Sequence, residues 1–338
     1  MNIAFITGIS GQDGSYLSEF LLEKGYAVCG LVRRHSTIFG TYRIDKILKD
    51  LDLFYGDMTD SLGLCDVFDK ILAKYPNYQR FEIYNLAAQS HVMVSFEVPE
   101  YTADVDAIGT LRLLDVVLKK IPKEKIRFYQ ASTSELYGEV LEEPQSETTP
   151  FNPQSPYAIA KLYAFWTVKQ YRKAYGIFAS NGILFNHTSP RRGETFVCHK
   201  IARGVQRIME GRLDVLELGN LDAQRDLGHA RDYVEGMWRI LQHHQPDEFV
   251  LATGKMYSVR QLVEFAFEIY GKHITWDGEG KHEKGLLDGR IVCQVNERYY
   301  RPAEVEKLQG DASKAKTELG WSTNVSVQDI LKEIMGKN

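Results

Sequence analysis

Short apolar runs alternate with longer amphipathic segments through the first 185 residues, and this alternation restricts the fold more than any other feature of the sequence. Helix-like segments separate most of the runs, and a polar segment follows the second. Strands that are joined through a helix lie parallel, and the crossover is right-handed. The sequence therefore predicts an α/β fold with a doubly wound parallel sheet. The apolar runs occupy residues 3–7, 27–32, 51–57, 81–88, 125–132 and 178–185.

The pattern becomes less regular after Phe185. We expect a loop over 186–194, a helix near 195–211, a short strand at 214–219 and a helix over 229–244. Residues 271–290 are polar and rich in glycine, which predicts an exposed loop. We therefore predict a sheet domain formed by residues 1–185 and about 220–252, and a smaller interleaved C-terminal α/β lobe. That lobe comprises about 186–219 and 253–338.

The composition narrows the class of protein. Of 338 residues, 44% are hydrophobic and 25% are charged, and the formal net charge is −4. These values are ordinary for a globular protein, and the basic stripe of a nucleic-acid-binding protein is missing. No apolar run approaches the ~20 residues that span a bilayer, and the N-terminus lacks signal-peptide features. Four separated cysteines fit reduced thiols. We expect a cytoplasmic protein with no nucleic-acid or membrane partner.

Three glycines stand where the first strand meets the first helix. The segment ITGISGQDG contains Gly8, Gly11 and Gly14. Glycine lets the backbone turn tightly and approach a pyrophosphate, which then sits at the helix N-terminus. Turn glycines alone are a weak signal, but their position at the first strand–helix junction predicts a dinucleotide site. The predicted site also includes the neighbouring residues Ser10, Gln12 and Asp13.

The end of the second strand indicates which dinucleotide binds. An NAD site usually carries a carboxylate there for the ribose hydroxyls. Here LVRRHS carries Arg33 and Arg34, whose guanidinium groups can bind a 2′-phosphate through charge-assisted bonds. Two solvated surface arginines are the structural alternative. The position favours NADP as the cofactor.

Two later strand ends extend the predicted cofactor site. Asp57 follows the third strand and could bind the adenine amino group, while Ala87 and Ala88 follow the fourth and allow close approach of the backbone. Each alone would be an ordinary strand end, so their order along the chain carries the prediction. The remaining predicted members of this site are Met58, Leu86, Ser90 and Tyr101.

Tyr157 and Lys161 are four residues apart in SPYAIAKLYAF, so both side chains lie on one helix face. A phenol titrates near ~10. A nearby ammonium, together with the positive nicotinamide ring, should lower that pKa and let Tyr157 act as a base. Tyr–Lys pairs are frequent by chance. After a glycine motif, and after Thr133 at the end of the fifth strand, the pair predicts oxidation of a sugar hydroxyl by NADP.

The order TGISGQDG, NLAAQSHV, STSELYG and YAIAK resembles the extended short-chain dehydrogenase/reductase family. Within it, several longer blocks resemble the GDP-mannose 4,6-dehydratase family, and they cover nearly the whole chain. These blocks are YTADVDAIGTLRLLD, FYQASTSELYG, GILFNHTSPRRG, LGNLDAQRDLGHARDYV and YYRPAEVEKLQGD. The resemblance implies a hydro-lyase of nucleotide-sugar metabolism that uses tightly bound NADP.

The resemblance also implies roles for individual residues. Oxidation at carbon 4 of GDP-mannose, elimination of water across carbons 5 and 6 and hydride return to carbon 6 would give GDP-4-keto-6-deoxymannose. The implied catalytic residues are Thr133, Glu135, Tyr157 and Lys161. Lys161, His187 and Arg192 would also help to hold NADP. The implied contacts to the GDP-sugar are Asn186, Val197, Lys200, Glu217, Gly219, Arg225, Arg301 and Glu304.

The chain departs from the family pattern at a few positions. Thr188 stands where Glu is usual, His199 where Arg is common, and Leu227 where Trp is common. The polar segment after Ile44 is also short. None of these positions belongs to the four catalytic residues, so the implied reaction class is unaffected.

Other functions share parts of this pattern. Alone, Thr133–Ser134–Glu135 would be an ordinary polar turn. A 4-epimerase shares the glycines and the Tyr–Lys pair but has no use for an acid–base group such as Glu135. Dehydratases of other nucleotide sugars, such as dTDP-glucose, usually carry Asp–Glu after the threonine, where this chain has Ser134–Glu135. A non-enzymatic NADP-binding protein would not need Tyr157 and Lys161.

Three further expectations concern packing, metals and assembly. The aromatic residues of 163–171 fall at helical spacing, which predicts core packing. His243 and His244 lack a third ligand, so we expect a solvated helix end and no metal site. Extended short-chain enzymes often pair through helix faces, and we expect a homodimer or homotetramer.

Overall fold

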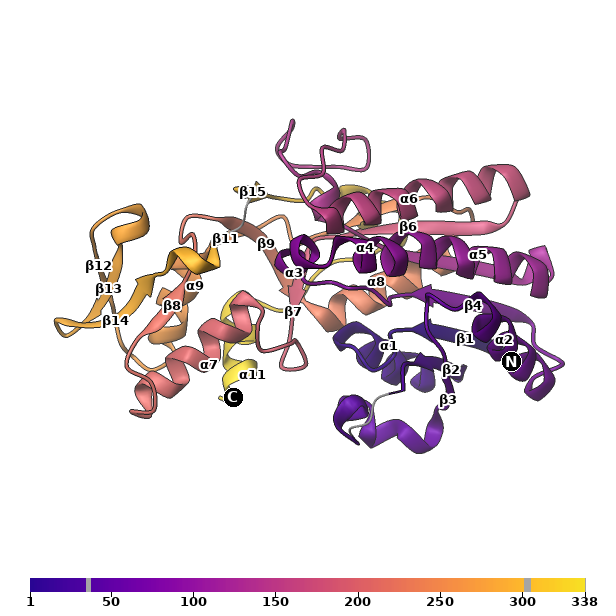
Figure 1. The fold of residues 1–338 in the computed structure, drawn as a ribbon, viewed down its shortest axis with the longest axis horizontal. Helices are drawn as coiled ribbons and strands as arrows, with labels where there is room; N and C mark the ends of the chain where they lie inside the picture. Colours follow the sequence, from indigo (N-terminus) through magenta and orange to yellow (C-terminus); the bar gives the residue numbers. More distant parts are fainter. Residues whose placement is uncertain (35–37, 301–304, 338) are drawn as a thin grey trace.

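A parallel sheet of seven strands forms the larger part of the molecule (Figure 1). The computed structural model describes residues 1–34, 38–300 and 305–337. The strands of this sheet are β1 (Asn2–Thr7), β2 (Ala27–Val32), β3 (Asp52–Tyr55), β4 (Arg80–Asn85), β5 (Ile126–Thr133), β6 (Phe178–Leu184) and β10 (Glu248–Leu251). Their order is β10-β6-β5-β4-β1-β2-β3, and neighbouring strands are parallel. The chain therefore winds outward in both directions from β1, which confirms the predicted doubly wound fold.

Helices cover both faces of this sheet. One face packs against α2 (Ser61–Lys74), α5 (Gly109–Lys120) and α6 (Pro156–Tyr175). The other face packs against α1 (Gln12–Glu23), α8 (Ala230–Gln242) and α10 (Ser313–Leu319). In α5 the fully buried Leu113, Leu114 and Val117 recur at helical spacing and contribute about 1.5–3 kcal/mol each. Two apolar layers of this kind hold the strand ends in fixed positions.

The segment before α5 consists of several short helical elements. It contains α3 (Val92–Glu97), α4 (Pro99–Thr102) and a π-helical segment, Ala103–Ile108, that continues into α5. Single π turns within a helix often mark functional sites, because they re-aim one side chain. Here the buried carboxylate of Asp106 lies in the π turn and accepts a hydrogen bond from the backbone N of Gln89 at 2.7 Å.

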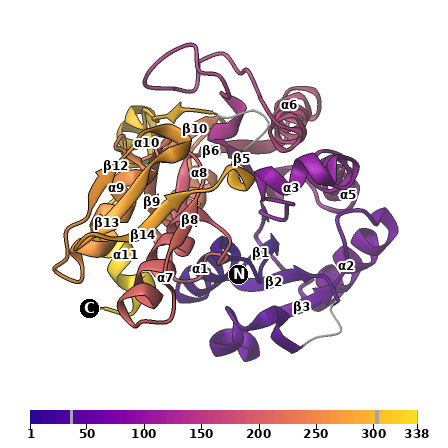
Figure 2. The same ribbon diagram turned by 60° about the vertical axis from the view of Figure 1, so that its left-hand side comes forward.

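A smaller lobe lies at the opposite end of the molecule from the seven-stranded sheet (Figures 1 and 2). Its core packs α7 (Val197–Met209), α9 (Val259–Glu268) and α11 (Val327–Met335) against a sheet of order β12-β13-β14-β8. Those strands are β12 (Thr275–Asp277), β13 (Lys284–Leu287), β14 (Arg290–Val295) and β8 (Leu216–Leu218). A third sheet joins the two parts through β7 (Asn186–Thr188), β9 (Gln224–His229), β11 (Met256–Ser258) and β15 (Lys307–Leu308).

The prediction of a loop over residues 271–290 is wrong, although most of these residues are exposed as predicted. This segment forms β12, β13 and the start of β14, which pair as antiparallel neighbours. Asp288 and Gly289 make the turn between β13 and β14, with φ angles of 52° and 79°. An Asp–Gly pair between apolar runs is a strong hairpin signal. That signal was hidden in the sequence by the many charged residues around it.

Side-chain exposure also differs from expectation at two places. In α6, Phe165 and Tyr171 are buried as predicted, but Tyr163 and Trp166 are 43% and 54% exposed. His243, expected to be solvated, is buried, and its Nδ1 bonds the backbone O of Gln245 at 2.9 Å. Among the helices of the described ranges, none has both the length and the hydropathy to cross a bilayer.

Candidate active site

A cleft of about 460 Å³ opens at the carboxyl ends of β1, β2, β3 and β4, where doubly wound folds bind their ligands. Most of the predicted cofactor residues line it. They are Gly8, Ser10, Gly11, Gln12, Asp13, Gly14, Arg33, Asp57, Met58, Leu86, Ala87, Ala88, Ser90, Tyr101 and Arg192. Three others lie outside this lining: Arg34 is exposed with its guanidinium 5.9 Å from the ring centre of Tyr55, while Lys161 and His187 lie in neighbouring clusters. The cleft therefore gathers residues from four strand ends.

Two glycines of the first loop are required by close backbone contacts. Gly8 has φ +68°, and a Cβ there would lie 3.0 Å from the backbone of Ala87. A Cβ on Gly14 would lie 2.4 Å from the O of Gly8. The loop leads into the N-terminus of α1, whose unpaired amides and dipole attract a phosphate. This cradle fits the pyrophosphate of a dinucleotide.

Four arginines line the cleft: Arg33, Arg43, Arg191 and Arg192. The Nη1 of Arg33 donates to the hydroxyl of Tyr101 at 2.5 Å. Arg43 ties two loops together, because it donates to the O of Arg191 at 2.6 Å and to the O of Ser10 at 3.4 Å. Several cations in one cleft suit a ligand with more than one phosphate.

Asp13 and His187 form a buried bridge beneath the glycine loop. The Nε2 of His187 bonds Asp13 Oδ2 at 2.9 Å, and its Nδ1 bonds the O of Phe185 at 2.8 Å. Burial favours the neutral form of Asp13, but His187 and Arg192 outweigh it and lower the pKa of this carboxyl to about 2. The bridge holds the first loop against the segment after β6.

The four catalytic candidates meet at the carboxyl end of β5. Thr133 ends the strand and Glu135 lies in the turn that follows, while Tyr157 and Lys161 come from the first turns of α6. This helix begins cleanly because the Ser155 side chain accepts from the N of Ala158 and proline occupies the first helical position. All four side chains are buried, and Lys161 Nζ donates to the O of Ala131 at 3.1 Å. The end of β5 and the start of α6 thus bring together two hydroxyls, a carboxylate and an ammonium.

The lowered pKa that we expect for Tyr157 depends on the charge of a bound nicotinamide ring and stays a prediction. Burial raises the pKa of this phenol, and Asp106 and Glu135 raise it further. A hydrogen bond with Thr133 and the charge of Arg192 act in the opposite direction, without overcoming the burial. Burial also lowers the pKa of Lys161. A further positive charge beside Tyr157 would therefore favour release of its proton.

Asp106 is a buried acid that the sequence interpretation missed. Its Oδ1 accepts from Gln89 N, and its Oδ2 is buried without a hydrogen-bond partner among the described residues. Burial raises the pKa of this carboxyl to about 6, although Lys161 opposes the shift. A signal was present in the sequence, because Asp106 precedes Gly109, Thr110 and Leu113 at helical spacing and so falls on the apolar face. Arg43 and Arg191 gave no such signal.

The predicted substrate residues lie mostly on separate elements of the smaller lobe. Lys200 of α7 has its Nζ 3.2 Å from the ring centre of Tyr299, and a Cβ on Gly219 would lie 2.7 Å from the O of Tyr299. Glu217 accepts from Gln294 and Asn296 at 3.1 Å. The structure thus gathers Lys200, Glu217 and Gly219 around residues 294–299.

The other predicted substrate residues are placed less closely together. Arg225 lies on β9 and donates to the O of Glu306 at 3.2 Å. Asn186 begins β7 beside β9, and Val197, 38% exposed, begins α7. The predicted residues Arg301 and Glu304 lie outside the described residues. Among the described candidates, Lys200 contacts Tyr299, before these residues in the chain, and Arg225 contacts Glu306, after them.

Three side chains at or near the predicted site are buried with polar atoms that bond no described residue. They are the hydroxyls of Ser134 and Thr188 and the Nδ1 of His199. The other ring nitrogen of His199 bonds the O of Pro190 at 3.2 Å, and burial lowers the pKa of this imidazole. Leu227, the third departure from the family pattern, packs in the apolar core of the smaller lobe.

The chain is similar to known proteins over nearly all of its length. A family model described as GDP-mannose 4,6 dehydratase matches residues 5–334. GDP-mannose 4,6 dehydratase 2 of Caenorhabditis elegans is 54% identical, over 99% of this chain and 88% of its own. The Homo sapiens GDP-mannose 4,6 dehydratase is 53% identical, over 99% and 90%. The UDP-glucose 4-epimerase of Thermotoga maritima, solved with UDP-glucose, has a TM-score of 0.79 and 26% identity, over 99% and 98% of the two chains.

Proposed function

Because the chain belongs to the GDP-mannose 4,6-dehydratase family, we propose that the residues at the end of β5 and on α6 dehydrate GDP-mannose at the edge of the cofactor cleft. The enzyme is an NADP-dependent hydro-lyase that forms GDP-4-keto-6-deoxymannose. One observation carries the assignment of residues: Thr133, Glu135, Tyr157 and Lys161 are buried together beside a dinucleotide cradle.

The cleft fits NADP. Gly8 and Gly14 leave room for the pyrophosphate, and we assign the 2′-phosphate to Arg33 and Arg34 at the end of β2. Arg43 lines the same cleft and adds positive charge beside them. When bound, NADP would supply the hydride chemistry, taking a hydride from carbon 4 of the sugar and returning it to carbon 6.

Tyr157 takes the proton from the carbon-4 hydroxyl in this scheme. A bound, oxidised nicotinamide ring would place positive charge beside this buried phenol and favour release of its proton. Lys161 stays fixed by its bond to the O of Ala131, one turn of α6 from Tyr157. Thr133 hydrogen-bonds the carbon-4 oxygen and stabilises the charge that develops on it. A 4-keto sugar results.

Glu135 performs the elimination that separates a dehydratase from an epimerase. The 4-keto group makes the carbon-5 proton acidic, and the Glu135 carboxylate removes it. The carboxylic acid then gives its proton to the carbon-6 hydroxyl, which leaves as water. A solvent proton reaches carbon 5 as carbon 6 is reduced, so the net change is the loss of one water molecule.

We assign the GDP group to the smaller lobe. Lys200, Arg225 and Arg301 supply the cations that a diphosphate needs, and Glu304 is suited to accept bonds from ribose hydroxyls. The remaining proposed contacts are Asn186, Val197, Glu217 and Gly219. The cluster of Lys200, Glu217 and Gly219 around residues 294–299 supports this assignment.

Domain division and location are further parts of this proposal. Residues 1–185 and about 220–252 would form the NADP-binding domain, and about 186–219 and 253–338 the nucleotide-sugar lobe. In support, β10 joins the seven-stranded sheet and α8 packs on it. Limited proteolysis that released a stable fragment across these bounds would contradict the division.

We place the enzyme in the cytoplasm, which fractionation of cells that express a tagged chain would check.

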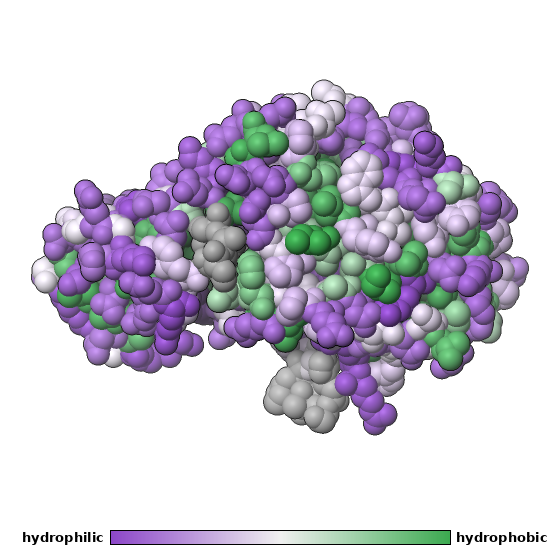
Figure 3. All heavy atoms as spheres, turned by 45° about the horizontal axis from the view of Figure 1, so that its top comes forward, coloured by the Kyte–Doolittle hydropathy of each residue, from purple (hydrophilic) through white to green (hydrophobic). Residues whose placement is uncertain are grey.

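A homo-oligomer completes the proposal. Ile159, Tyr163 and Trp166 form an exposed apolar stripe on α6, at 58%, 43% and 54% exposure. Figure 3 shows apolar side chains gathered on the face over α5 and α6. We propose that two copies pair through this stripe to give a homodimer, or two such dimers a homotetramer. Light scattering of Trp166→Lys should then give a smaller mass than the wild type.

The test of the function uses purified protein, NADP⁺ and GDP-mannose in D₂O. A keto sugar with deuterium at carbon 5 is the expected product. Glu135→Gln should lower kcat about 10³-fold, because general acid–base catalysis contributes about 10² to 10⁴, while GDP-mannose still binds. A product epimerised at carbon 4 with carbon 6 intact, or a Glu135→Gln variant with wild-type turnover, would overturn the assignment.

A further inference from the structure

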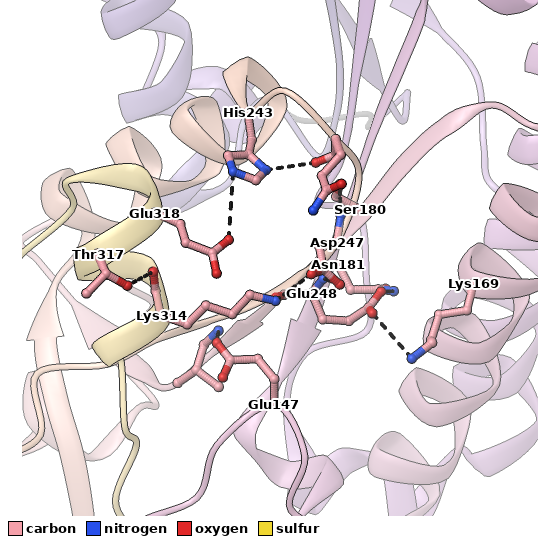
Figure 4. Close-up of polar contacts among 12 residues, drawn as sticks. Glu147, Lys169, Ser180, Asn181, His243, Asp247, Glu248, Lys314, Thr317 and Glu318 are labelled. Atoms are coloured by element: carbon pink, nitrogen blue, oxygen red, sulfur yellow. Dashed lines mark hydrogen bonds and ion pairs between the residues drawn. The ribbon is translucent and has the colours of Figure 1, made fainter.

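A polar cluster lies where α6 packs on β5, β6 and β10, and Figure 4 shows Asn181, Glu248 and Lys169 of it. It consists of Ser132, Asn181, Glu248, Lys169 and Arg172, and we name it the α6 anchor. Ser132, Asn181 and Glu248 come from three adjacent strands and are 3%, 0% and 5% exposed. Lys169 and Arg172 come from the second half of α6. The anchor therefore connects the helix to three strands of the sheet.

Asn181 is the centre of the anchor. Its Oδ1 accepts from the hydroxyl of Ser132 at 3.2 Å, and its Nδ2 donates to Glu248 Oε1 at 3.2 Å. The same Nδ2 also donates to the O of Phe165 in α6 at 3.3 Å. One buried amide thus bonds β5, β10 and the helix backbone at once.

Glu248 adds charge to these bonds. Its Oε1 accepts from Nη2 of Arg172 at 2.7 Å, and its Oε2 lies 3.3 Å from Nζ of Lys169. Arg172 also donates to the O of Ala179 on β6 at 3.1 Å. Two cations of α6 therefore converge on one buried carboxylate of the edge strand.

The preceding residue makes a more exposed ion pair on the other face of the sheet. Successive side chains of a strand point to opposite faces. Asp247 accepts from Lys314 of α10 at 2.6 Å, whereas Glu248 faces α6 (Figure 4). α10 carries none of the catalytic candidates. The chain thus provides its own comparison between an ion pair that holds a catalytic helix and one that holds another helix.

A buried cluster of this kind is a poor means of gaining stability alone. Desolvation of a buried ion pair offsets most of its attraction, and apolar side chains of similar size often stabilise as well. Hydrogen bonds to a helix carbonyl are directional, so they fix the position of the helix along its axis. Apolar packing does this less strictly. Register is the best-attested use of such groups.

The α6 anchor acts on the elements that hold the catalytic residues. Phe165 lies about 12 Å along the helix axis from Tyr157 and about 6 Å from Lys161, at 1.5 Å per residue. Ser132 directly precedes Thr133 on β5. A shift of α6 at Phe165 moves Tyr157 and Lys161 by the same amount relative to Thr133, because the helix is a rigid rod over three turns.

We propose that the α6 anchor is a positioning device for catalysis, which sets the register of the Tyr157–Lys161 helix against the Thr133 strand. Asn181 and Glu248 are its positioning residues. The proposal rests on the proposed function, since it assumes that Thr133, Tyr157 and Lys161 act on one sugar carbon. A misplacement of about 1 Å can cost about 100-fold in rate, so a small slip is enough to be measured.

The experiment compares Glu248→Gln with Asp247→Asn in the full-length enzyme. Each change removes one carboxylate charge, from Glu248 at the start of β10 or from the residue directly before it. Glu248→Gln should lower kcat about 10-fold, leave KM for GDP-mannose within about 2-fold and leave NADP affinity unchanged. Its kcat–pH profile should move to higher pH, because a slip of α6 weakens the hydrogen bond with Thr133 that lowers the pKa of Tyr157. Asp247→Asn should keep kcat and the pH profile within about 2-fold of the wild type.

Lys169→Gln provides a milder variant if Glu248→Gln does not fold, because this lysine is partly exposed. It should lower kcat about 3-fold with the same constant KM. Equal losses of kcat in the Glu248 and Asp247 variants, or losses that follow the fall in Tm alone, would overturn the proposal. The wild type in the same assay separates the two claims, since failure to form a keto sugar would overturn the proposed function instead.

Discussion

The two halves of the candidate site are held together in different ways. The cofactor and catalytic half lies on the ends of adjacent parallel strands, and buried backbone-linked bonds fix its groups, such as Lys161 Nζ to the O of Ala131. The substrate half comes from short separate elements of the smaller lobe. There Lys200 lies against the ring of Tyr299, and Glu217 against two amides.

This difference predicts where each half is sensitive. Geometry limits the first half, because the glycine loop packs directly against the backbone of Ala87. The loop therefore has no room to move without disturbing the cofactor site. Charge limits the second half, because side chains with long stems can move to keep their contacts with a phosphate. Changes in the first half should therefore alter cofactor binding and kcat, whereas changes in the second should alter KM.

The largest effect should follow Gly8→Ala. The new Cβ would lie 3.0 Å from the backbone of Ala87, so the loop must move away from the strand end that forms the other wall of the cradle. We expect NADP affinity to fall about 100-fold, since several amide–phosphate bonds of about 1.5–3 kcal/mol each are misplaced together. Fluorescence titration with NADPH measures the change.

Gly25→Ala is the matched control for this variant. Gly25 also has a left-handed φ, +77°, but no atom lies within 4 Å of the position of its Cβ. Gly25 follows the C-terminus of α1, and Gly8 precedes its N-terminus. Both variants carry the cost of a side chain at positive φ, about 1 kcal/mol of unfolding free energy. Equal NADP affinities for the two would show that the cradle tolerates movement, and the comparison would fail.

A smaller effect should follow Lys200→Met in the substrate half. The methionine keeps the length of the side chain but removes a charge that we assign to the diphosphate. One charge-assisted bond is worth about 1.5–3 kcal/mol, so KM for GDP-mannose should rise about 10-fold while kcat stays within about 2-fold. Lys284→Met, at an exposed position of β13 in the same lobe, should change neither kcat nor KM. A loss of kcat with constant KM would place Lys200 among the catalytic groups instead.

The sequence predicted the fold correctly wherever apolar residues recur regularly over a whole helix or strand. The strands and helices of residues 1–185 follow from alternation over whole elements. The π turn at Ala103–Ile108 does not, because it depends on where one buried carboxylate finds a hydrogen bond, which is a tertiary contact. The hairpin of β13 and β14 does have a local signal, the Asp288–Gly289 turn. It was missed because the strands are short and many charged residues surround the turn.

The candidate site shows the same limit. Glycines and the Tyr–Lys pair carry their own spacing, so Gly8, Gly14, Tyr157 and Lys161 could be selected from the sequence. Arg43 could not, because its contacts with the loops of Ser10 and Arg191 cross long separations in the chain. The sequence also does not show that burial raises the pKa of Tyr157 in the protein alone, because burial is a property of the assembled structure.

Asp106→Asn sharpens the comparison through folding stability and not through ligand binding, because it tests a buried acid of the rigid half. Burial raises the pKa of this carboxyl from 3.8 to about 6. The folded state therefore holds the proton more tightly than the unfolded chain. Its contribution to stability is fully present below pH 3.8 and is lost as the pH rises through 6. Asparagine cannot ionise, so the wild type should lose stability relative to Asp106→Asn over this window, by about 3 kcal/mol at most. Urea unfolding of both proteins at pH 4.5, 6 and 8 measures the gap. A gap that stays constant across these pH values would mean that the Asp106 carboxylate is ionised in the fold as readily as in water, and that Lys161 alone compensates its burial.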